Sequence, residues 1–97
     1  MYRHVSVFTL KNKNEIDSFI ELLNEVGKCS LIINNEVGVN LTNIPNDGRG
    51  PDFGDVIQII DFASKQDLDD YPKSKEHLRL FNEGPVMEKV TAIDYKI

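Results

Sequence analysis

The chain has 97 residues, a net charge of −5 at neutral pH, and a hydrophobic fraction of 40%. This length predicts one domain over residues 1–97, with a core thin enough that a partner subunit would stabilise it. The negative charge excludes nucleic acid as an expected partner, because its phosphates would be repelled. No apolar stretch approaches the roughly 20 residues of a membrane-spanning helix, so we expect no membrane partner.

The cysteine and histidine content limits the chemistry further. The single cysteine, Cys29, cannot form an internal disulfide, which favours a reducing compartment. The first residues lack the basic and apolar regions of a signal peptide, so we expect a cytoplasmic protein. Two histidines and scattered carboxylates do not have the spacing of a zinc site, and spacing indicates no Ser-His-Asp arrangement. We therefore expect no metal and no cofactor.

The first element in chain order is a strand over residues 2–10. Alternate residues of a strand point to opposite faces, so the sequence assigns each side chain to one of two sets. One face carries Tyr2, His4, Ser6, Phe8 and Leu10, and the other carries Arg3, Val5, Val7 and Thr9. Neither set is wholly polar, so we expect both faces to be at least partly covered.

A helix follows over residues 16–26, where apolar residues recur at helical spacing. Asn12 stands where a capping box would begin, and Asn14 is an alternative cap. Gly27 follows the last apolar residue, and a glycine there can adopt the left-handed conformation that ends many helices.

Two strands are predicted in the middle of the chain, over residues 31–39 and 53–62, from their content of Val and Ile. Asn34 and Asn35 interrupt the first of them, which indicates a bulge or a change of register. Residues 41–52 between the strands are almost all turn formers. We therefore expect an antiparallel hairpin with a long surface loop.

Two short helices are predicted next. Ser64 begins the first, which carries Tyr71, and Pro72 should break it because the residue before a proline avoids helical angles. The second carries His77 and ends at Gly84, which is followed by a proline.

A final strand over residues 89–97 completes the order strand, helix, strand, strand, helix, strand. This βαββαβ order is the ferredoxin-like α+β pattern, a four-stranded antiparallel sheet with helices on one face. The uncovered face would carry apolar side chains. We therefore expect a homodimer in which two sheets pair and form an α+β barrel.

Four short motifs lie in these predicted elements: His4-Val5-Ser6-Val7-Phe8, Asp61-Phe62-Ala63-Ser64, Asp70-Tyr71 and Asp94-Tyr95. In this order and spacing they resemble the stress-responsive α/β-barrel domain (Dabb) family. The resemblance spans essentially the whole chain. It implies a small dimeric ferredoxin-like protein whose two sheets form a barrel.

A plant polyketide cyclase of that family offers a more detailed resemblance. His4, Tyr71 and His77 match three of its residues, whereas Ser74 and Lys75 replace the first histidine and the proline of its Tyr-x-x-His-Pro-x-His motif. The resemblance implies an intramolecular aldol condensation. His77 would be the base, Tyr71 the donor to the enolate oxygen and His4 a positioning group, roles that suit imidazole and phenol groups.

Three functions remain open from the sequence. The first is binding of a small, mostly apolar molecule in a pocket between sheet and helices, with His4, Tyr71 and His77 as its polar contacts. The second is a cofactor-independent enzyme of the cyclase or lyase type that uses Tyr71 and His77 as catalytic residues. The third is a structural dimer without a small-molecule site, in which His77 packs against Phe81 and Tyr71 belongs to the core.

Overall fold

The computed structural model describes residues 1–42, 44 and 47–97. Its helices and strands, including two short 3-10 helices (η), are β1 (Tyr2–Leu10), η1 (Lys13–Glu15), α1 (Ile16–Val26), β2 (Ile32–Val39), β3 (Val56–Phe62), α2 (Lys65–Asp70), η2 (Tyr71–Lys73), α3 (Lys75–Glu83) and β4 (Met87–Lys96). Residues 43, 45 and 46 belong to the predicted surface loop and lie outside the described part of the chain.

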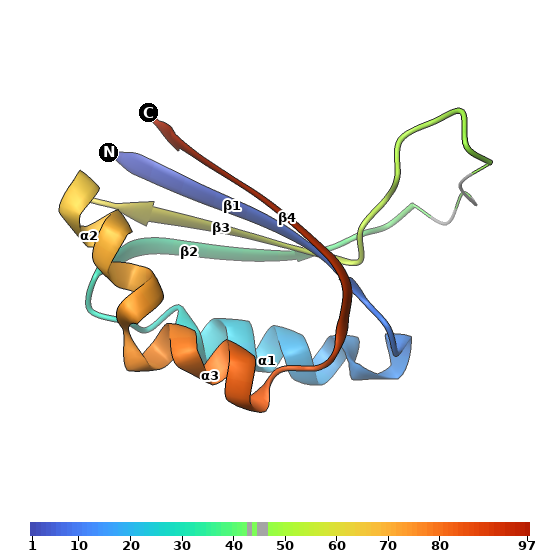
Figure 1. Ribbon diagram of the computed structural model, residues 1–97, viewed down its shortest axis with the longest axis horizontal. Helices are drawn as coiled ribbons and strands as arrows, with labels where there is room; N and C mark the ends of the chain where they lie inside the picture. Colours follow the sequence, from blue (N-terminus) through green and yellow to red (C-terminus); the bar gives the residue numbers. More distant parts are fainter. Residues whose placement is uncertain (43, 45–46) are drawn as a thin grey trace.

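The four strands form one antiparallel sheet in the order β2-β3-β1-β4. Figure 1 shows α1 and α3 side by side on one face of this sheet, while residues 47–52 extend beyond the ends of the strands. The predicted ferredoxin-like α+β fold and the predicted hairpin are both confirmed.

The N-terminus of the first helix has an extra turn. Asn12 caps η1, which leads directly into α1, so the first of the two predicted caps is confirmed. At the other end Gly27 has φ −63°, so the predicted left-handed conformation is wrong. Space explains this glycine instead, because a Cβ atom there would overlap the side chain of Asn35 on β2.

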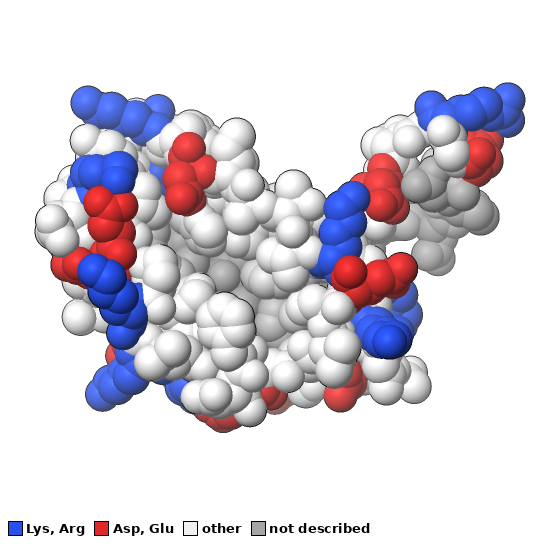
Figure 2. Space-filling model, viewed as in Figure 1, with Lys and Arg blue, Asp and Glu red and all other residues white. Residues whose placement is uncertain are grey.

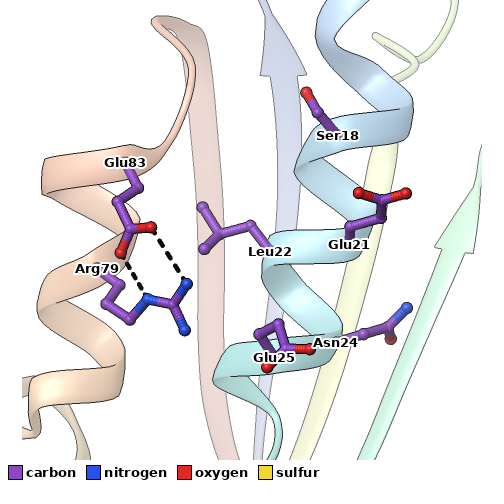
Figure 3. Close-up of a pocket in the computed structure, with 7 residues that line it drawn as sticks. All are labelled: Ser18, Glu21, Leu22, Asn24, Glu25, Arg79 and Glu83. Atoms are coloured by element: carbon purple, nitrogen blue, oxygen red, sulfur yellow. Dashed lines mark hydrogen bonds and ion pairs between the residues drawn. The ribbon is translucent and has the colours of Figure 1, made fainter.

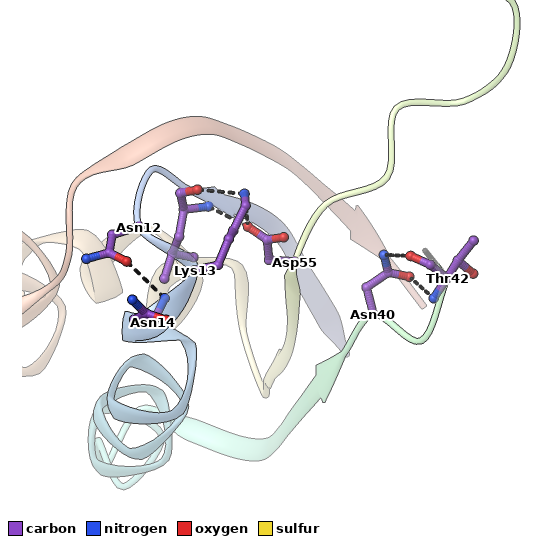
Figure 4. A network of polar contacts seen from close by, with 7 residues as sticks. Asn12, Lys13, Asn14, Asn40, Thr42 and Asp55 are labelled. Carbon is purple, nitrogen blue, oxygen red and sulfur yellow. Dashed lines mark hydrogen bonds and ion pairs between the residues drawn. The ribbon is translucent and has the colours of Figure 1, made fainter. Parts of the chain in front are cut away.

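The hairpin strands are shorter than predicted, since β2 begins at Ile32 and β3 begins three residues late, at Val56. Asp55 was predicted to be part of β3 but lies just before it. Its carboxylate accepts hydrogen bonds from the Leu10 amide at 2.7 Å and from Lys13 Nζ at 2.8 Å (Figure 4). The end of the loop is thereby fastened to the end of β1. The predicted irregularity in β2 is confirmed by a register shift between Ile32 and Asn34.

The break near Pro72 has a different cause from the predicted one. Tyr71, directly before the proline, keeps right-handed helical angles of φ −53° and ψ −46°, so the expected avoidance of these angles is wrong. The chain leaves the helical conformation only at Ser74, where ψ is 152°. Ser74 then caps α3, so the predicted second helix begins immediately after the break.

The core lies between the sheet and α1. Its fully buried side chains come from β1, α1 and β3, and the largest are Phe19, Phe62, Leu10, Leu23 and Ile60. Burial of each such side chain stabilises the fold by roughly 1.5–3 kcal/mol before conformational entropy is counted. The side chains of α3 are not buried to the same degree, and the space beneath this helix is where the candidate site lies.

Candidate functional site

A cavity of about 550 Å³ lies between the helix-facing side of the sheet and α3. Its lining comes from β1, β3, β4, α1, η2 and α3, and consists of His4, Ser6, Phe8, Phe19, Gln58, Tyr71, His77, Leu80, Phe81, Pro85, Met87, Val90 and Ala92. No lysine, arginine, aspartate or glutamate is among these residues. Figure 2 shows the corresponding hollow as a largely uncharged area between α3 and β4. The volume is typical of pockets that bind small molecules.

Tyr71 and His77 form an edge-to-face ring pair beside this cavity. Their ring centroids are 5.0 Å apart, and Tyr71 is only 3% exposed. Within the described part of the chain, the Tyr71 hydroxyl and His77 Nδ1 are the two buried side-chain polar atoms without a hydrogen-bond partner. Most buried polar atoms in proteins have such a partner, so two neighbouring exceptions in one cavity wall require an explanation.

Ser74 fixes the positions of both residues. Its hydroxyl donates to the Tyr71 carbonyl at 2.6 Å and accepts from the His77 amide at 3.1 Å. This serine stands where the resemblance places a histidine, and here it is the N-cap of α3. Ser74 therefore links Tyr71 and His77 through their backbone groups.

Burial has opposite consequences for the two ionisable rings. Desolvation raises the pKa of Tyr71, and Cys29 and Glu76 raise it further, so the phenol stays protonated and can donate a hydrogen bond. Desolvation is also the main cause that lowers the pKa of His77, with a smaller contribution from His4, while the Pro72 backbone opposes the shift. His77 is therefore a neutral imidazole at neutral pH.

His4 lies on the same wall, but neither of its ring nitrogens is free. Nδ1 lies 2.5 Å from a carboxylate oxygen of Asp94, and Nε2 lies 2.8 Å from the hydroxyl of Ser6. Asp94 is directly opposite His4 on the neighbouring strand, whereas Ser6 is two residues further along β1 and shares its face. Sequence spacing did not indicate this Ser-His-Asp arrangement, which depends on the pairing of β1 with β4.

The three residues singled out from the sequence do converge. His4 and Tyr71 have ring centroids 6.4 Å apart, and Tyr71 contacts His77, whose ring also lies 5.3 Å from that of Phe81. Sequence reasoning missed Ser6 and Asp94 as partners of His4. The i, i+2 spacing of Ser6 could have been noticed, whereas the contact with Asp94 depends on the β1–β4 register.

A second hollow of about 490 Å³ lies between α1 and α3 (Figure 3). It is an open groove whose main polar feature is an exposed ion pair in which Arg79 donates to both carboxylate oxygens of Glu83, at 2.5 and 3.1 Å. None of its described residues offers a buried unpartnered polar atom. We therefore place the candidate site in the cavity that contains Tyr71 and His77.

Other kinds of site find less support in the described residues. Over residues 1–42, 44 and 47–97, no group of three or more His, Cys, Asp or Glu side chains is arranged to hold a metal ion. Across that same part of the chain, every helix is too short or too polar to span a membrane.

Solved structures provide the relevant comparison, since no protein-family model and no curated protein matches the chain. A Dabb family protein from Mesorhizobium loti aligns with a TM-score of 0.76 at 20% identity, over 99% of this chain and 95% of that one. A dimeric ferredoxin-like protein of unknown function from Thermobifida fusca has a TM-score of 0.76 at 16% identity, over 99% and 90%. Hydroxynitrile lyase from Passiflora edulis has a TM-score of 0.76 at 20% identity, over 99% and 92%.

These similarities cover almost the whole chain at low sequence identity, so they establish the fold. The Dabb-type ferredoxin-like fold that the sequence motifs indicated is therefore confirmed.

Proposed function

We propose that this protein binds a small, mostly apolar molecule that carries a carbonyl or hydroxyl group. The observation that supports this proposal is the pair of unpartnered atoms, the Tyr71 hydroxyl and His77 Nδ1, in the wall of one cavity. Leaving a polar group buried without a hydrogen bond costs about 1–3 kcal/mol. A ligand oxygen that accepts from Tyr71 would remove this cost on binding.

The rest of the cavity specifies an apolar ligand body. Phe8, Phe19, Leu80 and Met87 provide aromatic and aliphatic walls. Phe81 is 76% exposed and belongs to the same lining, so the apolar surface continues to the mouth. A ligand with its polar group at Tyr71 and an apolar chain toward Phe81 would satisfy both parts of the cavity.

We further propose that the protein is a cytoplasmic homodimer that pairs through the uncovered face of its sheet. Ile59, Val5 and Ile93 lie side by side across three strands in the register, and Ile93 is 62% exposed. Within the described part of the chain, no helix covers this face (Figure 1). The Thermobifida fusca protein with the same fold is described as dimeric, which supports association as a dimer.

Enzymatic activity of the cyclase or lyase type is the second candidate. It is supported by the neutral state of His77, whose uncharged ring has a lone pair with which to remove a proton next to a carbonyl. Tyr71 could donate to the enolate oxygen that forms.

A stress-response role is part of the family resemblance and is tested separately, by comparing the heat tolerance of cells with and without the gene.

Binding is tested with 4-propylphenol and 4-propylacetophenone, followed by amide chemical shifts in NMR spectra. We expect both probes to shift residues of η2, α3 and β4, and Tyr71→Phe to weaken binding about tenfold, equivalent to 1.4 kcal/mol. Tyr95→Phe is the matched control, because Tyr95 lies on the other face of the sheet. Equal affinities for wild type and Tyr71→Phe would contradict the proposed site.

Catalysis is tested by exchange of the methyl protons of 4-propylacetophenone in D₂O. Wild type should accelerate this exchange, and His77→Gln should abolish the acceleration while the circular dichroism spectrum is unchanged. Exchange no faster than in buffer would reject the enzymatic candidate and leave the binding proposal intact.

A further inference from the structure

The chain of contacts from Asp94 through His4 to Ser6 is not required for ligand binding at Tyr71 and His77. It joins a carboxylate, an imidazole and a hydroxyl through distances of 2.5 Å and 2.8 Å. The Ser6 side chain lines the cavity, and Asp94 lies at its outer side with about half of its side chain exposed. The hydroxyl is therefore the end of this chain that faces the cavity.

The positions of the protons follow from the chemistry of the three groups. An ionised carboxylate only accepts hydrogen bonds, so His4 Nδ1 must carry the proton that it shares with Asp94. In a neutral imidazole the other nitrogen, Nε2, is then an acceptor. When the His4 ring is neutral, Ser6 donates its hydroxyl proton to Nε2.

This is the hydrogen-bond pattern of an activated serine. A base that already accepts the hydroxyl proton can remove it as the oxygen attacks, and a carboxylate on the other nitrogen stabilises the imidazolium that forms. The pattern is defined by geometry and by the role of each group, and it occurs on unrelated folds. The order along the chain, His4, Ser6 and Asp94, is therefore no objection.

The strands hold this arrangement with little freedom. His4 and Ser6 are on the same face of the central strand β1, and β4 places Asp94 opposite His4. Gln58 lies opposite Ser6 on β3, is 1% exposed, and is fixed by its own hydrogen bond to Asn35 at 2.9 Å. A site built on paired strands is positioned more exactly than one built on loops.

We propose that Ser6 is a nucleophile that takes the acyl group from esters with a small apolar acyl chain. The Ser6 oxygen bonds to the carbonyl carbon while its proton passes to His4 Nε2, and the carbonyl oxygen becomes an oxyanion that accepts a hydrogen bond from Tyr71. The bond to the leaving alcohol then breaks, and that alcohol takes the proton from His4. Water, activated in the same way, releases the acid and restores Ser6.

This inference goes beyond the proposed function, because reversible binding needs no covalent step. The same cavity would hold the acyl chain against its apolar wall, which includes Phe8, Leu80 and Met87. The two ideas can fail separately. Binding of 4-propylphenol reports on the cavity, whereas a covalent adduct reports on Ser6.

The test uses an alkyl fluorophosphonate, which phosphonylates activated serines, with intact-mass and peptide mass spectrometry. Wild type should gain one adduct, located in the segment that contains Ser6, and Ser6→Ala should gain none. Asp94→Asn should be labelled about 100-fold more slowly, since general-base assistance contributes 10²–10⁴-fold. Asp94 is half exposed, so this variant tests the role of the carboxylate without disturbing the core.

The matched control is Ser18→Ala, which removes an exposed serine of α1 outside this cavity. It should be labelled at the wild-type rate. The same order of rates is expected for hydrolysis of 4-nitrophenyl butyrate. Folded wild type without an adduct, an adduct that persists in Ser6→Ala, or wild-type labelling of Asp94→Asn would each overturn the proposal.

Discussion

A buried carboxylate on the open face of the sheet and a buried hydroxyl on the helix-facing side differ in their hydrogen bonding. On the open face, Asp61 is 3% exposed and accepts from Arg3 at 2.8 and 3.1 Å and from Asn34 at 3.3 Å. On the helix-facing side, the hydroxyl of Tyr71 is equally buried and has no partner in the described part of the chain. A buried group with partners stabilises one structure, whereas a buried group without a partner is available to a ligand.

The difference arises within a few residues of sequence. Arg3 and His4 are neighbours in β1, and alternation sends the first to the open face and the second to the cavity. Each has a carboxylate opposite it on an adjacent strand, Asp61 on β3 and Asp94 on β4. The first pair lies on the open face that we propose as the dimer interface, and the second pair leads to the Ser6 hydroxyl in the cavity.

The largest effect should come from a charge in the centre of the open face. Val5→Glu places a carboxylate between Ile59 and Ile93, where a partner subunit would bury it without a counterion. We expect the dissociation constant of the dimer to rise at least about 100-fold, equivalent to 2.7 kcal/mol. Light scattering over a dilution series measures this change.

The control for that experiment is Val86→Glu, which changes an exposed valine outside the strands. The dissociation constant of the Val86→Glu dimer should equal that of the wild-type dimer. A wild-type protein that is monomeric at micromolar concentration would overturn the assignment of the open face as an interface.

A smaller effect is expected from breaking the polar cluster on the same face. Asp61→Ala leaves Arg3 and Asn34 without their acceptor, and we expect the free energy of unfolding to fall by about 2 kcal/mol. This value is below that of a fully buried pair because a third of the Arg3 side chain is exposed. Urea denaturation measures it. Asp69→Ala, which breaks an exposed pair with Lys65, should change the value by under about 0.5 kcal/mol.

The pH dependence of this cluster has a definite sign. The hydrogen bonds from Arg3 hold the pKa of Asp61 below its usual range, against the effect of desolvation. The stabilisation is therefore present above the pKa of an unfolded aspartate, about 3.9, and is lost as the pH falls through the lower folded value. Asp61→Ala should remove this part of the acid sensitivity, and an unchanged acid unfolding curve would contradict the assignment.

On the cavity side, removal of a polar group should have the opposite effect on stability. Tyr71→Phe deletes a buried hydroxyl that has no partner, so the free energy of unfolding should rise by about 1 kcal/mol while probe binding weakens. Thermal unfolding without ligand measures the first change. A decrease in stability would mean that the hydroxyl has a partner in solution and is not held for a ligand.

The sequence was sufficient for the fold because its signals are local. Helical spacing in residues 16–26, strand alternation in residues 2–10 and turn formers in residues 41–52 each act over a few neighbours, and their order leaves few topologies. It was less informative at positions decided by distant contacts. Gly27 is explained by the overlap that a Cβ atom would make with Asn35 on β2, and not by its own backbone angles.

For the candidate site, the sequence indicated which residues take part but not all of their contacts. His4, Tyr71 and His77 could be selected by family resemblance, and the structure brings them together. The hydrogen-bond partners of His4 could not be predicted from this resemblance. Its contact with Asp94 joins residues 90 positions apart and depends on strand register. From the sequence, His4 was either a strand residue bonded to a carbonyl or a pocket residue, whereas the structure shows its two ring nitrogens beside Asp94 and Ser6.

The smallest expected effect is a change in the pKa of His77, one of the two histidines of the cavity. His77 should titrate with a pKa below 6.5, because desolvation penalises its charged form, and Tyr71→Phe should move that pKa since the two rings are in contact. A folded pKa below the unfolded one stabilises the protein above pH 6.5, and this stabilisation is lost as the pH falls through the folded value. NMR titration of the imidazole signals measures the pKa, with His4→Gln to assign them. A His77 pKa at or above 6.5 would show that the ring is hydrated, and the contrast between Asp61, which has partners, and the unpartnered groups of the cavity would then rest on Tyr71 alone.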